Sequence, residues 1–178
     1  MRLKPILFFL VVGGMAAFLV FRQAQQGGGG MIRIGQIAPD FTIKDSAGKD
    51  VKLSDYKGKL IFLNFWASWC KPCEAEMPDL ELMHKAYKDR GFQMMAVSTD
   101  ANVADAQKFY DDRKFSLPWY SDPGRRIADK YHVNVYPETF IIDGKGHVLK
   151  HYPGPVNTRI MTMIEDLIKE QEAERPAQ

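Results

Sequence analysis

The sequence predicts an α/β domain of three layers, in which a mixed central β-sheet lies between helices. Two apolar segments, Leu60 to Trp66 and Phe92 to Val97, lack the alternation of a half-buried strand, so both indicate strands covered on two faces. A segment with helical spacing follows each of them. The stretch from Thr139 to Tyr152 predicts an antiparallel hairpin, and a closing helix comes after it.

Length and composition are those of a globular protein. The chain of 178 residues suits one domain of ordinary size with extensions. Its hydrophobic content of 46% and charged content of 26% are typical of a chain with an adequate core. The net charge of +2 is too small to indicate a nucleic-acid partner.

The first residues are expected to form a targeting segment, because a buried core helix would conflict with their terminal position and basic flank. Arg2 and Lys4 precede an apolar run from Pro5 to Phe21, which Arg22 closes. Residues 1–22 are therefore read as a short membrane-spanning anchor or as a signal peptide. The absence of a clear Ala-x-Ala cleavage site favours the anchor. With either segment, the rest of the chain would lie outside the cytoplasm.

The remaining chain divides into a tether, a folded domain and a tail. Residues 23–34 are polar and contain the run Gly27 to Gly30, so they are expected to form a flexible linker. The domain is expected over residues 35–172, and residues 173–178 are a polar tail.

The domain begins with a predicted β-hairpin. The segment from Gly35 to Ile43 is a loop that leads into a strand, and Ala47-Gly48 mark the turn before Val51 to Leu53. The next segment, Ser54 to Lys59, resembles a single helical turn that ends at Gly58.

A helix is predicted from Glu74 to about Arg90, with Gly91 as its C-cap. Pro78 lies in its second turn and is expected to kink it. Its apolar positions at helical spacing are Met77, Leu80, Met83 and Tyr87.

Later elements follow the same reasoning. Asn102 is expected to cap a helix that runs through Arg113. A short extended segment at Leu117 to Tyr120 and a short helix at Gly124 to Tyr131 come next. The hairpin turns at Asp143 to Gly146, and an amphipathic helix from about Ile160 ends near Glu172.

The two cysteines of the chain stand in the motif Trp69-Cys70-Lys71-Pro72-Cys73, between a predicted buried strand and a predicted helix. The unpaired N–H groups at a helix N-terminus stabilise an anion, here the Cys70 thiolate, which is the reactive form of the side chain. Cys73 lies one turn further on the same side, where it can attack a mixed disulfide formed at Cys70.

The two residues between the cysteines suit this chemistry. Pro72 lacks an N–H and fits the first helical turn, and Lys71 adds a positive charge near the sulfurs. The redox-active group is then the Cys70–Cys73 pair itself, and neither a further cofactor nor a metal is expected.

The motif and its surroundings resemble a known family. The run from Phe65 to Cys73, with Pro78 in the helix and Tyr136-Pro137 before a strand, closely resembles thioredoxin-fold oxidoreductases. The resemblance covers about residues 35 to 170. It implies a three-layer thioredoxin-like fold with an N-terminal β-hairpin and a helical insertion.

Further segments resemble the membrane-anchored TlpA/ResA/CcmG (DsbE) branch. These are the opening Gly35 to Phe41, the segment Val51 to Asp55 and the insertion Asn102 to Arg113. The run from Pro137 to Phe140, followed by Ile141-Ile142-Asp143, is particularly similar to the CcmG type.

The resemblance implies roles around the cysteines. Pro137 would be a cis-proline that faces them, which leaves neighbouring backbone groups to pair with an extended substrate chain. Trp69 and Tyr136 would flank the sulfurs and shape the docking surface. Lys71 and Pro72 are expected to contribute to the same substrate-binding surface.

One residue departs from the pattern of thioredoxins, many of which have a buried aspartate at the position of Asn64. Asn64 cannot take a proton, so another carboxylate or water must deprotonate the resolving cysteine. Glu138, beside the proline, is the candidate, because Glu74 and Glu76 are expected on the helix surface. The alternative for Glu138 is an exposed side chain that aids solubility.

The resemblance also implies a cellular location, a substrate and an electron donor. The chain would reduce protein disulfides on the periplasmic side of a bacterial inner or cytoplasmic membrane, with an integral-membrane thiol donor. Apocytochrome c or a thiol protein of haem attachment would be the substrate. The direction of exchange stays open, because Lys71 and the helix end make the couple more oxidising while Glu74, Glu76 and Glu138 act the other way.

The same residues are compatible with other functions. Soft thiolates suit Cu(I), and copper-binding assembly proteins of this fold add a distant histidine, such as His132 or His147 here. Their cysteines are spaced one residue wider, however. A weak thiol peroxidase is a further alternative, but peroxiredoxins have a Thr-x-x-Cys context where this chain has Ala67 to Cys70. A zinc site would need a second cysteine pair.

Overall fold

The computed structural model describes residues 31–157 and 159–173. The anchor or signal expected at residues 1–22, most of the linker and the last residues of the tail lie outside this part. Within the described residues no helix has both the length and the apolar character needed to cross a membrane.

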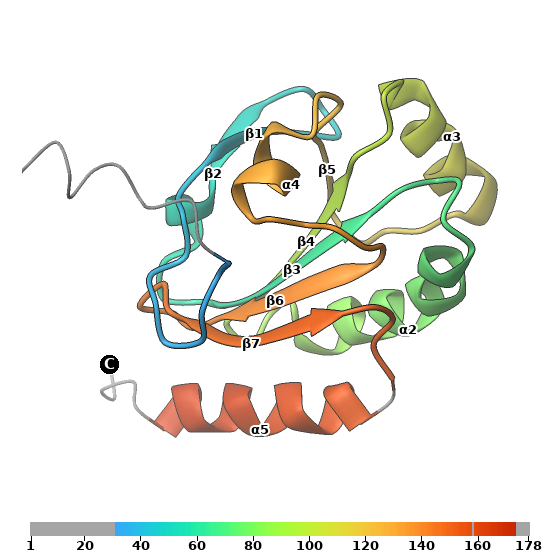
Figure 1. Cartoon of the computed structure of the whole chain (residues 1–178). Coiled ribbons are helices and arrows are strands. Elements are labelled where there is room, and N and C mark those ends of the chain that lie inside the picture. The colour runs from blue at the N-terminus through green and yellow to red at the C-terminus, as the bar shows by residue number, and fades with distance from the viewer. Residues whose placement is uncertain (1–30, 158, 174–178) are drawn as a thin grey trace, which may run out of the picture. The chain divides into compact units, whose positions relative to one another are not determined.

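A mixed sheet of seven strands forms the centre of the domain (Figure 1). The strand order is β2-β1-β5-β4-β3-β6-β7. Strands β3, β4 and β5 are parallel to one another, and the hairpins β1–β2 and β6–β7 add antiparallel strands on either side. The bounds are β1 Thr42–Asp45, β2 Asp50–Lys52, β3 Leu60–Trp66, β4 Phe92–Ser98, β5 Trp119–Ser121, β6 Glu138–Ile142 and β7 Val148–Pro153.

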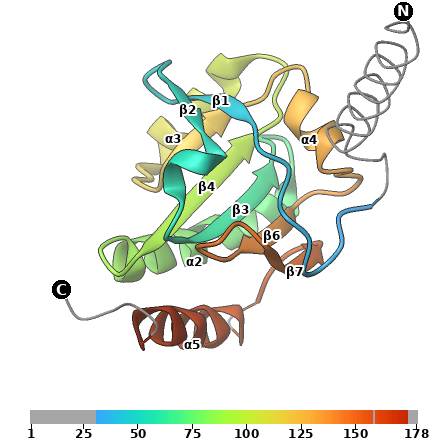
Figure 2. The same cartoon turned by 90° about the vertical axis from the view of Figure 1, so that its left-hand side faces the viewer.

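Helices cover both faces of the sheet. The 3-10 turn η1 (Leu53–Tyr56) and α4 (Arg126–Lys130) supply core residues on one face. The other face packs against α2 (Lys71–Tyr87), α3 (Val103–Arg113) and α5 (Arg159–Ala173). Figures 1 and 2 show α2 and α5 together on one side, with α4 opposite. The predicted three-layer thioredoxin-like fold is confirmed.

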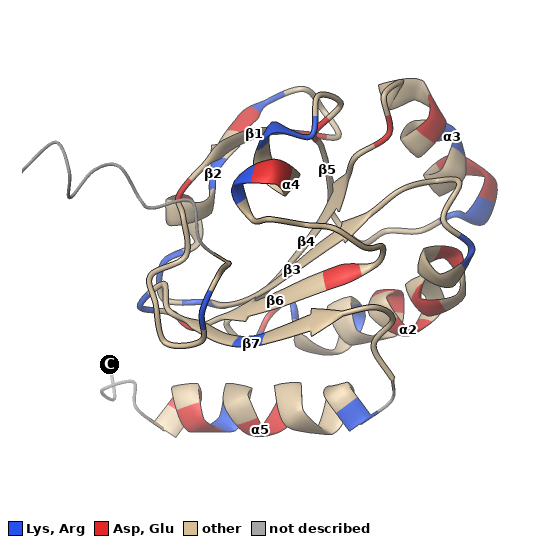
Figure 3. Cartoon of the chain, viewed as in Figure 1, with Lys and Arg blue, Asp and Glu red and all other residues tan. Residues whose placement is uncertain are grey.

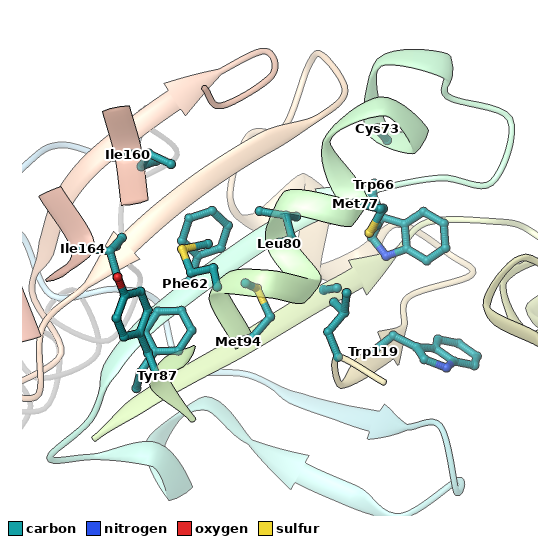
Figure 4. Packing of buried hydrophobic residues seen from close by; sticks show 14 of the residues in the cluster. Phe62, Trp66, Cys73, Met77, Leu80, Tyr87, Met94, Trp119, Ile160 and Ile164 are labelled. Atoms are coloured by element: carbon teal, nitrogen blue, oxygen red, sulfur yellow. The ribbon is translucent and has the colours of Figure 1, made fainter. Parts of the chain in front are cut away.

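The central strands are buried on both faces, as their composition predicts. All seven residues of β3 are buried, and Figure 3 shows β3 and β4 without charged segments, which lie mainly on helices and loops. Because side chains alternate along a strand, Phe62 and Trp66 face α2 whereas Leu63 and Phe65 face α4. Figure 4 shows the α2 face, where Met77 and Leu80 of the helix lie near Phe62 and Trp66 of β3.

Several element boundaries differ from the prediction by a few residues. Helix α2 begins at Lys71 rather than Glu74, because Cys70 is its N-cap, and it ends at Tyr87 rather than Arg90. It includes Pro78, and the expected kink there stays a prediction. The predicted cap of α3 is confirmed, since the Asn102 side chain accepts the amide hydrogen of Ala104 at 3.2 Å.

Three loops meet at one end of the sheet. Phe65 near the end of β3 pairs with Glu138 at the start of β6, and Glu138 pairs with Pro153 at the end of β7. The β3–α2 loop, the loop before β6 and the loop after β7 therefore leave the sheet at the same end, on the right in Figure 1. The cysteine motif lies in the first of these loops.

Candidate functional site

Cys70 and Cys73 form a disulfide at the N-terminus of α2, with their Cα atoms 5.3 Å apart. The amide of Cys73 donates a hydrogen bond to Cys70 Sγ, with N and S 3.2 Å apart. This is the cap interaction of the helix, so an N–H already points at the sulfur that would carry the charge in the reduced form.

The two sulfurs differ in access. Cys70 retains 5% of its surface, whereas Cys73 retains none and faces the core beside α2 (Figure 4). Thiol–disulfide exchange requires that the incoming sulfur reach the attacked one. Cys70 is therefore the sulfur that can meet a partner protein, and Cys73 can react only with Cys70.

Lys71 forms an ion pair with a neighbouring carboxylate. Lys71 pairs with Glu74 at 3.0 Å on the solvent side of the first turn, and Arg113 of α3 also pairs with Glu74. The hydrogen bond from Arg113 lowers the pKa of Glu74 most, and the hydrogen bond from Lys71 lowers it further. Glu74 is thus an ionised surface group, as expected, and it offsets part of the Lys71 charge near the sulfurs.

The loop before β6 brings Tyr136 and Pro137 to the end of the sheet where the cysteine motif lies. The Tyr136–Pro137 peptide bond is cis, which is the isomer that the resemblance implies. The carbonyl of Pro137 accepts the amide hydrogen of Gly154 at 2.8 Å, so it is already paired.

The aromatic ring of Trp69, the residue before Cys70, contacts the ring of Tyr136. Trp69 and Tyr136 meet edge to face, with centroids 5.6 Å apart. Trp69 is 66% exposed, which is unusual for so large an apolar side chain and typical of a contact surface. Arg125 lies over the Tyr136 ring, 5.4 Å from its centroid, and donates a hydrogen bond to its hydroxyl.

Glu76 is buried, so the expectation that it lies on the helix surface is wrong. Only 4% of the residue is exposed, and it lies one turn after Cys73 on the buried side of α2. Asn64 Nδ2 donates to its Oε1 and the Val156 amide to its Oε2, each at 2.9 Å. Burial raises the pKa of Glu76 to about 7, despite these two hydrogen bonds, which act to lower it.

Glu138 is buried, so the alternative of an exposed side chain is wrong. Its carboxylate lies 2.6 Å from His151 Nε2 and accepts the amide hydrogens of Asn134 and Val135. Since Glu138 shares its register with Phe65, its side chain is on the α4 face of the sheet, opposite Glu76. A role in taking the proton from Cys73 stays a prediction for Glu138, and the geometry favours Glu76.

Asp100 is a buried residue that sequence reasoning missed. Its carboxylate accepts hydrogen bonds from the Ser68 amide at 3.0 Å and from the hydroxyls of Ser68 and Ser98, both at 2.8 Å. It therefore fixes the loop that leads from β3 to Cys70. Its position just after β4 is the available signal, because the carboxyl ends of parallel strands meet at one edge.

Among residues 31–157 and 159–173, no three or more His, Cys, Asp or Glu side chains gather in a group that could hold an ion.

Taken together, the fold and the dithiol at a helix N-terminus define a thioredoxin-like thiol-disulfide oxidoreductase. The sequence profile of the AhpC/TSA family matches residues 34–151. The chain therefore belongs to that family and, within it, to the thiol-disulfide oxidoreductases of the ResA and DsbE type.

The similarity to individual relatives extends over most of the domain. The chain is 34% identical over 149 residues to thiol-disulfide oxidoreductase ResA of Bacillus thuringiensis (strain Al Hakam), covering 84% of this chain and 86% of the relative. It is 36% identical over 145 residues to ResA of Geobacillus kaustophilus, covering 82% and 80%. A crystal structure described as thiol:disulfide interchange protein DsbE from Chlorobium tepidum matches with a TM-score of 0.71 and 36% identity, covering 79% of this chain and 98% of that one.

Proposed function

We propose that this protein reduces disulfides of exported proteins on the extracytoplasmic side of a bacterial membrane, in the maturation of c-type cytochromes. The observation that carries the proposal is the Cys70–Cys73 pair at the N-terminus of α2, with the Cys73 amide directed at Cys70 Sγ. This arrangement stabilises a thiolate at the more accessible of the two sulfurs.

The first step is an exchange at Cys70. The Cys70 thiolate attacks one sulfur of the substrate disulfide, a Cys70–substrate S–S bond forms, and the substrate S–S bond breaks. The released substrate thiolate takes a proton from water. The helix N-terminus and the Cys73 amide favour this step because they stabilise the attacking thiolate.

The second step needs a thiolate at Cys73, which is fully buried. A buried thiol resists ionisation, so a proton acceptor must be close. Glu76 fits this role because it lies one turn away on the same side of α2 and has a pKa of about 7, near the operating pH. The Cys73 thiolate then attacks Cys70, the mixed disulfide breaks, and the substrate leaves with both of its sulfurs reduced.

Substrate docking is assigned to the surface beside the sulfurs. Trp69 and Tyr136 offer adjacent aromatic rings, and Pro137 directly precedes β6, so the backbone of the loop before β6 is where an extended segment could pair. Lys71 and Pro72 complete this surface on the helix side. The substrate chemistry that fits is an extended, partly apolar segment that flanks a disulfide.

The cellular location and the partners that we propose rest on the sequence of residues 1–22 and on the family resemblance. An oxidising compartment re-forms disulfides, so a reductant that acts there needs a supply of electrons. An integral-membrane thiol protein is the donor that we propose, and apocytochrome c, or a thiol protein of haem attachment, is the proposed substrate.

The decisive experiment is the redox equilibrium of the domain with glutathione, followed by alkylation of free thiols. We expect a reduction potential well below that of the glutathione couple, because the protein acts as a reductant. A potential well above it would contradict this direction and would assign the protein to disulfide formation or isomerisation.

A further inference from the structure

A pair of titratable side chains, the buried Glu138 and the half-buried His151, lies on the β6–β7 hairpin, away from the α2 face that holds Glu76. Nε2 of His151 and Oε1 of Glu138 are 2.6 Å apart. A carboxylate only accepts hydrogen bonds, so the imidazole Nε2 donates in this contact. The His151 ring is stacked on Phe140, with centroids 4.4 Å apart and planes 4° apart, which fixes the direction of that N–H.

The other oxygen of Glu138 holds the loop that precedes Pro137. Oε2 accepts the amide hydrogen of Asn134 at 3.0 Å and that of Val135 at 3.4 Å. Arg125 also bonds this loop, because it donates to the Val133 carbonyl at 3.0 Å and to the Tyr136 hydroxyl. The loop that presents Tyr136 to Trp69 is therefore held both by a carboxylate and by a guanidinium.

We propose that Glu138 and His151 are positioning residues: the His151 N–H fixes the Glu138 carboxylate, which fixes the backbone of Asn134 and Val135 and so sets the docking surface at Tyr136. This inference rests on the proposed function, in which that surface receives the substrate. It assigns Glu138 a role in substrate binding instead of proton transfer.

The contacts explain why the effect should be on binding. The carboxylate already accepts three hydrogen bonds, and a charge-assisted bond is among the stronger ones in a protein. Loss of the His151 donor frees the carboxylate to turn, and the two amides then lose a fixed partner. The Cys70–Cys73 pair belongs to the core on the α2 face, whereas His151 stacks on Phe140, which belongs to the core on the α4 face; the pair also keeps its own cap, so the chemistry of the sulfurs should not change.

The test compares two substitutions at one position. His151→Phe keeps a ring that can stack on Phe140 but removes the N–H, whereas His151→Gln keeps an N–H that can reach Glu138. His147→Phe is the matched control, since His147 lies just before β7 at the turn of the same hairpin and bonds Asp143 instead. The full chain would be assayed with insulin as a protein disulfide and with oxidised glutathione as a small one. Dithiothreitol would supply the electrons for each turnover, and the rate without the protein would be subtracted.

We expect His151→Phe to raise KM for insulin about fivefold with kcat unchanged, and to leave the rate with oxidised glutathione unchanged. His151→Gln and His147→Phe should match the wild type. In the same variants, amide hydrogen exchange at Asn134 and Val135 should be faster only in His151→Phe, which gives a second readout at the loop itself.

Two outcomes would overturn the inference alone. The first is an active wild type with His151→Phe unchanged in both KM and loop exchange. The second is an equal loss with insulin and with oxidised glutathione, which would mean that the pair acts on the sulfurs. A wild-type protein that reduces neither disulfide would overturn the proposed function, and the inference would fall with it.

Discussion

Nδ2 of Asn64 lies 2.9 Å from Oε1 of Glu76, and this hydrogen bond joins the central strand β3 to the helix that carries both cysteines. The same amide donates to Thr139 Oγ1 of β6 at 3.0 Å. Asn64 takes no proton itself, but it holds a carboxylate that can take one. The acid–base function that we assign to this site is therefore on α2, one turn beyond Cys73.

The first prediction concerns that carboxylate. Replacement Glu76→Gln should slow the resolution of the mixed disulfide at pH 7 by about tenfold or more, because a general base is lost. In the wild type this rate should rise with pH through an inflection near pH 7, the pKa of Glu76, and the variant should lack the inflection. Single-turnover release of a trapped substrate between pH 5 and 9 measures it.

Glu138→Gln is the matched control for this measurement, since it makes the same chemical change on the other face of the sheet. It should keep the inflection near pH 7. If the inflection persisted in Glu76→Gln and vanished in Glu138→Gln, the proton acceptor would be Glu138.

The second prediction is the pH dependence of stability. The pKa of Glu76 is 4.5 when unfolded and about 7 in the folded, oxidised protein, so the folded state binds this proton more tightly. Its contribution is complete below pH 4.5 and is lost as the pH rises through 7. The shift corresponds to at most about 3.5 kcal/mol, at about 1.4 kcal/mol per pKa unit.

Denaturant unfolding of the oxidised protein at pH 5 and pH 8 checks this. The free energy of unfolding should decrease more between these values in the wild type than in Glu76→Gln. An equal decrease in both proteins would show that the buried carboxyl group is not the cause.

The third prediction concerns the loop before Cys70. Asp100→Ala should lower the free energy of unfolding by about 2 kcal/mol or more, because the Ser68 amide and two hydroxyls lose their buried acceptor. Asp112→Ala is the control, since Asp112 makes an exposed pair with Lys108 that contributes about 0.5 kcal/mol or less. Equal losses in the two variants would argue against Asp100 as the anchor of this loop.

The fourth prediction separates docking from stability. Trp69→Ala should change the free energy of unfolding little, because the side chain is exposed, but it should raise KM for a protein disulfide severalfold. Leu82→Ala removes another exposed apolar side chain of this region, on α2 three turns beyond the cysteines, and should leave KM unchanged. A KM that is the same in both variants would remove Trp69 from the docking surface.

Much of the fold can be predicted from the sequence because the sequence patterns that indicate its elements are local. The unbroken apolar run of β3, the Asn102 cap and the cysteines before a helix each depend on neighbours in the chain. Element ends are less certain, and the start of α2 differs because a cysteine, which is not a usual cap residue, serves as the N-cap.

The polar part of the site is less legible because it depends on distant partners. The buried carboxyl group of Glu76 accepts hydrogen bonds from Asn64 and from the Val156 amide, which is 80 residues away in sequence. Helical spacing does place Glu76 on the side of Cys73, and that is the signal that could have found it. The alternation of β6 likewise places Glu138 opposite Thr139, which the sequence alone could not assign to a face of the sheet.

The most direct test of the account is to trap a substrate on each single-cysteine variant and to quantify the mixed disulfide. With insulin, Cys73→Ser should accumulate a covalent complex through Cys70, because the resolving thiol is missing. Cys70→Ser should form little or none, since Cys73 is buried. Equal trapping by the two variants, or trapping by Cys70→Ser alone, would contradict it.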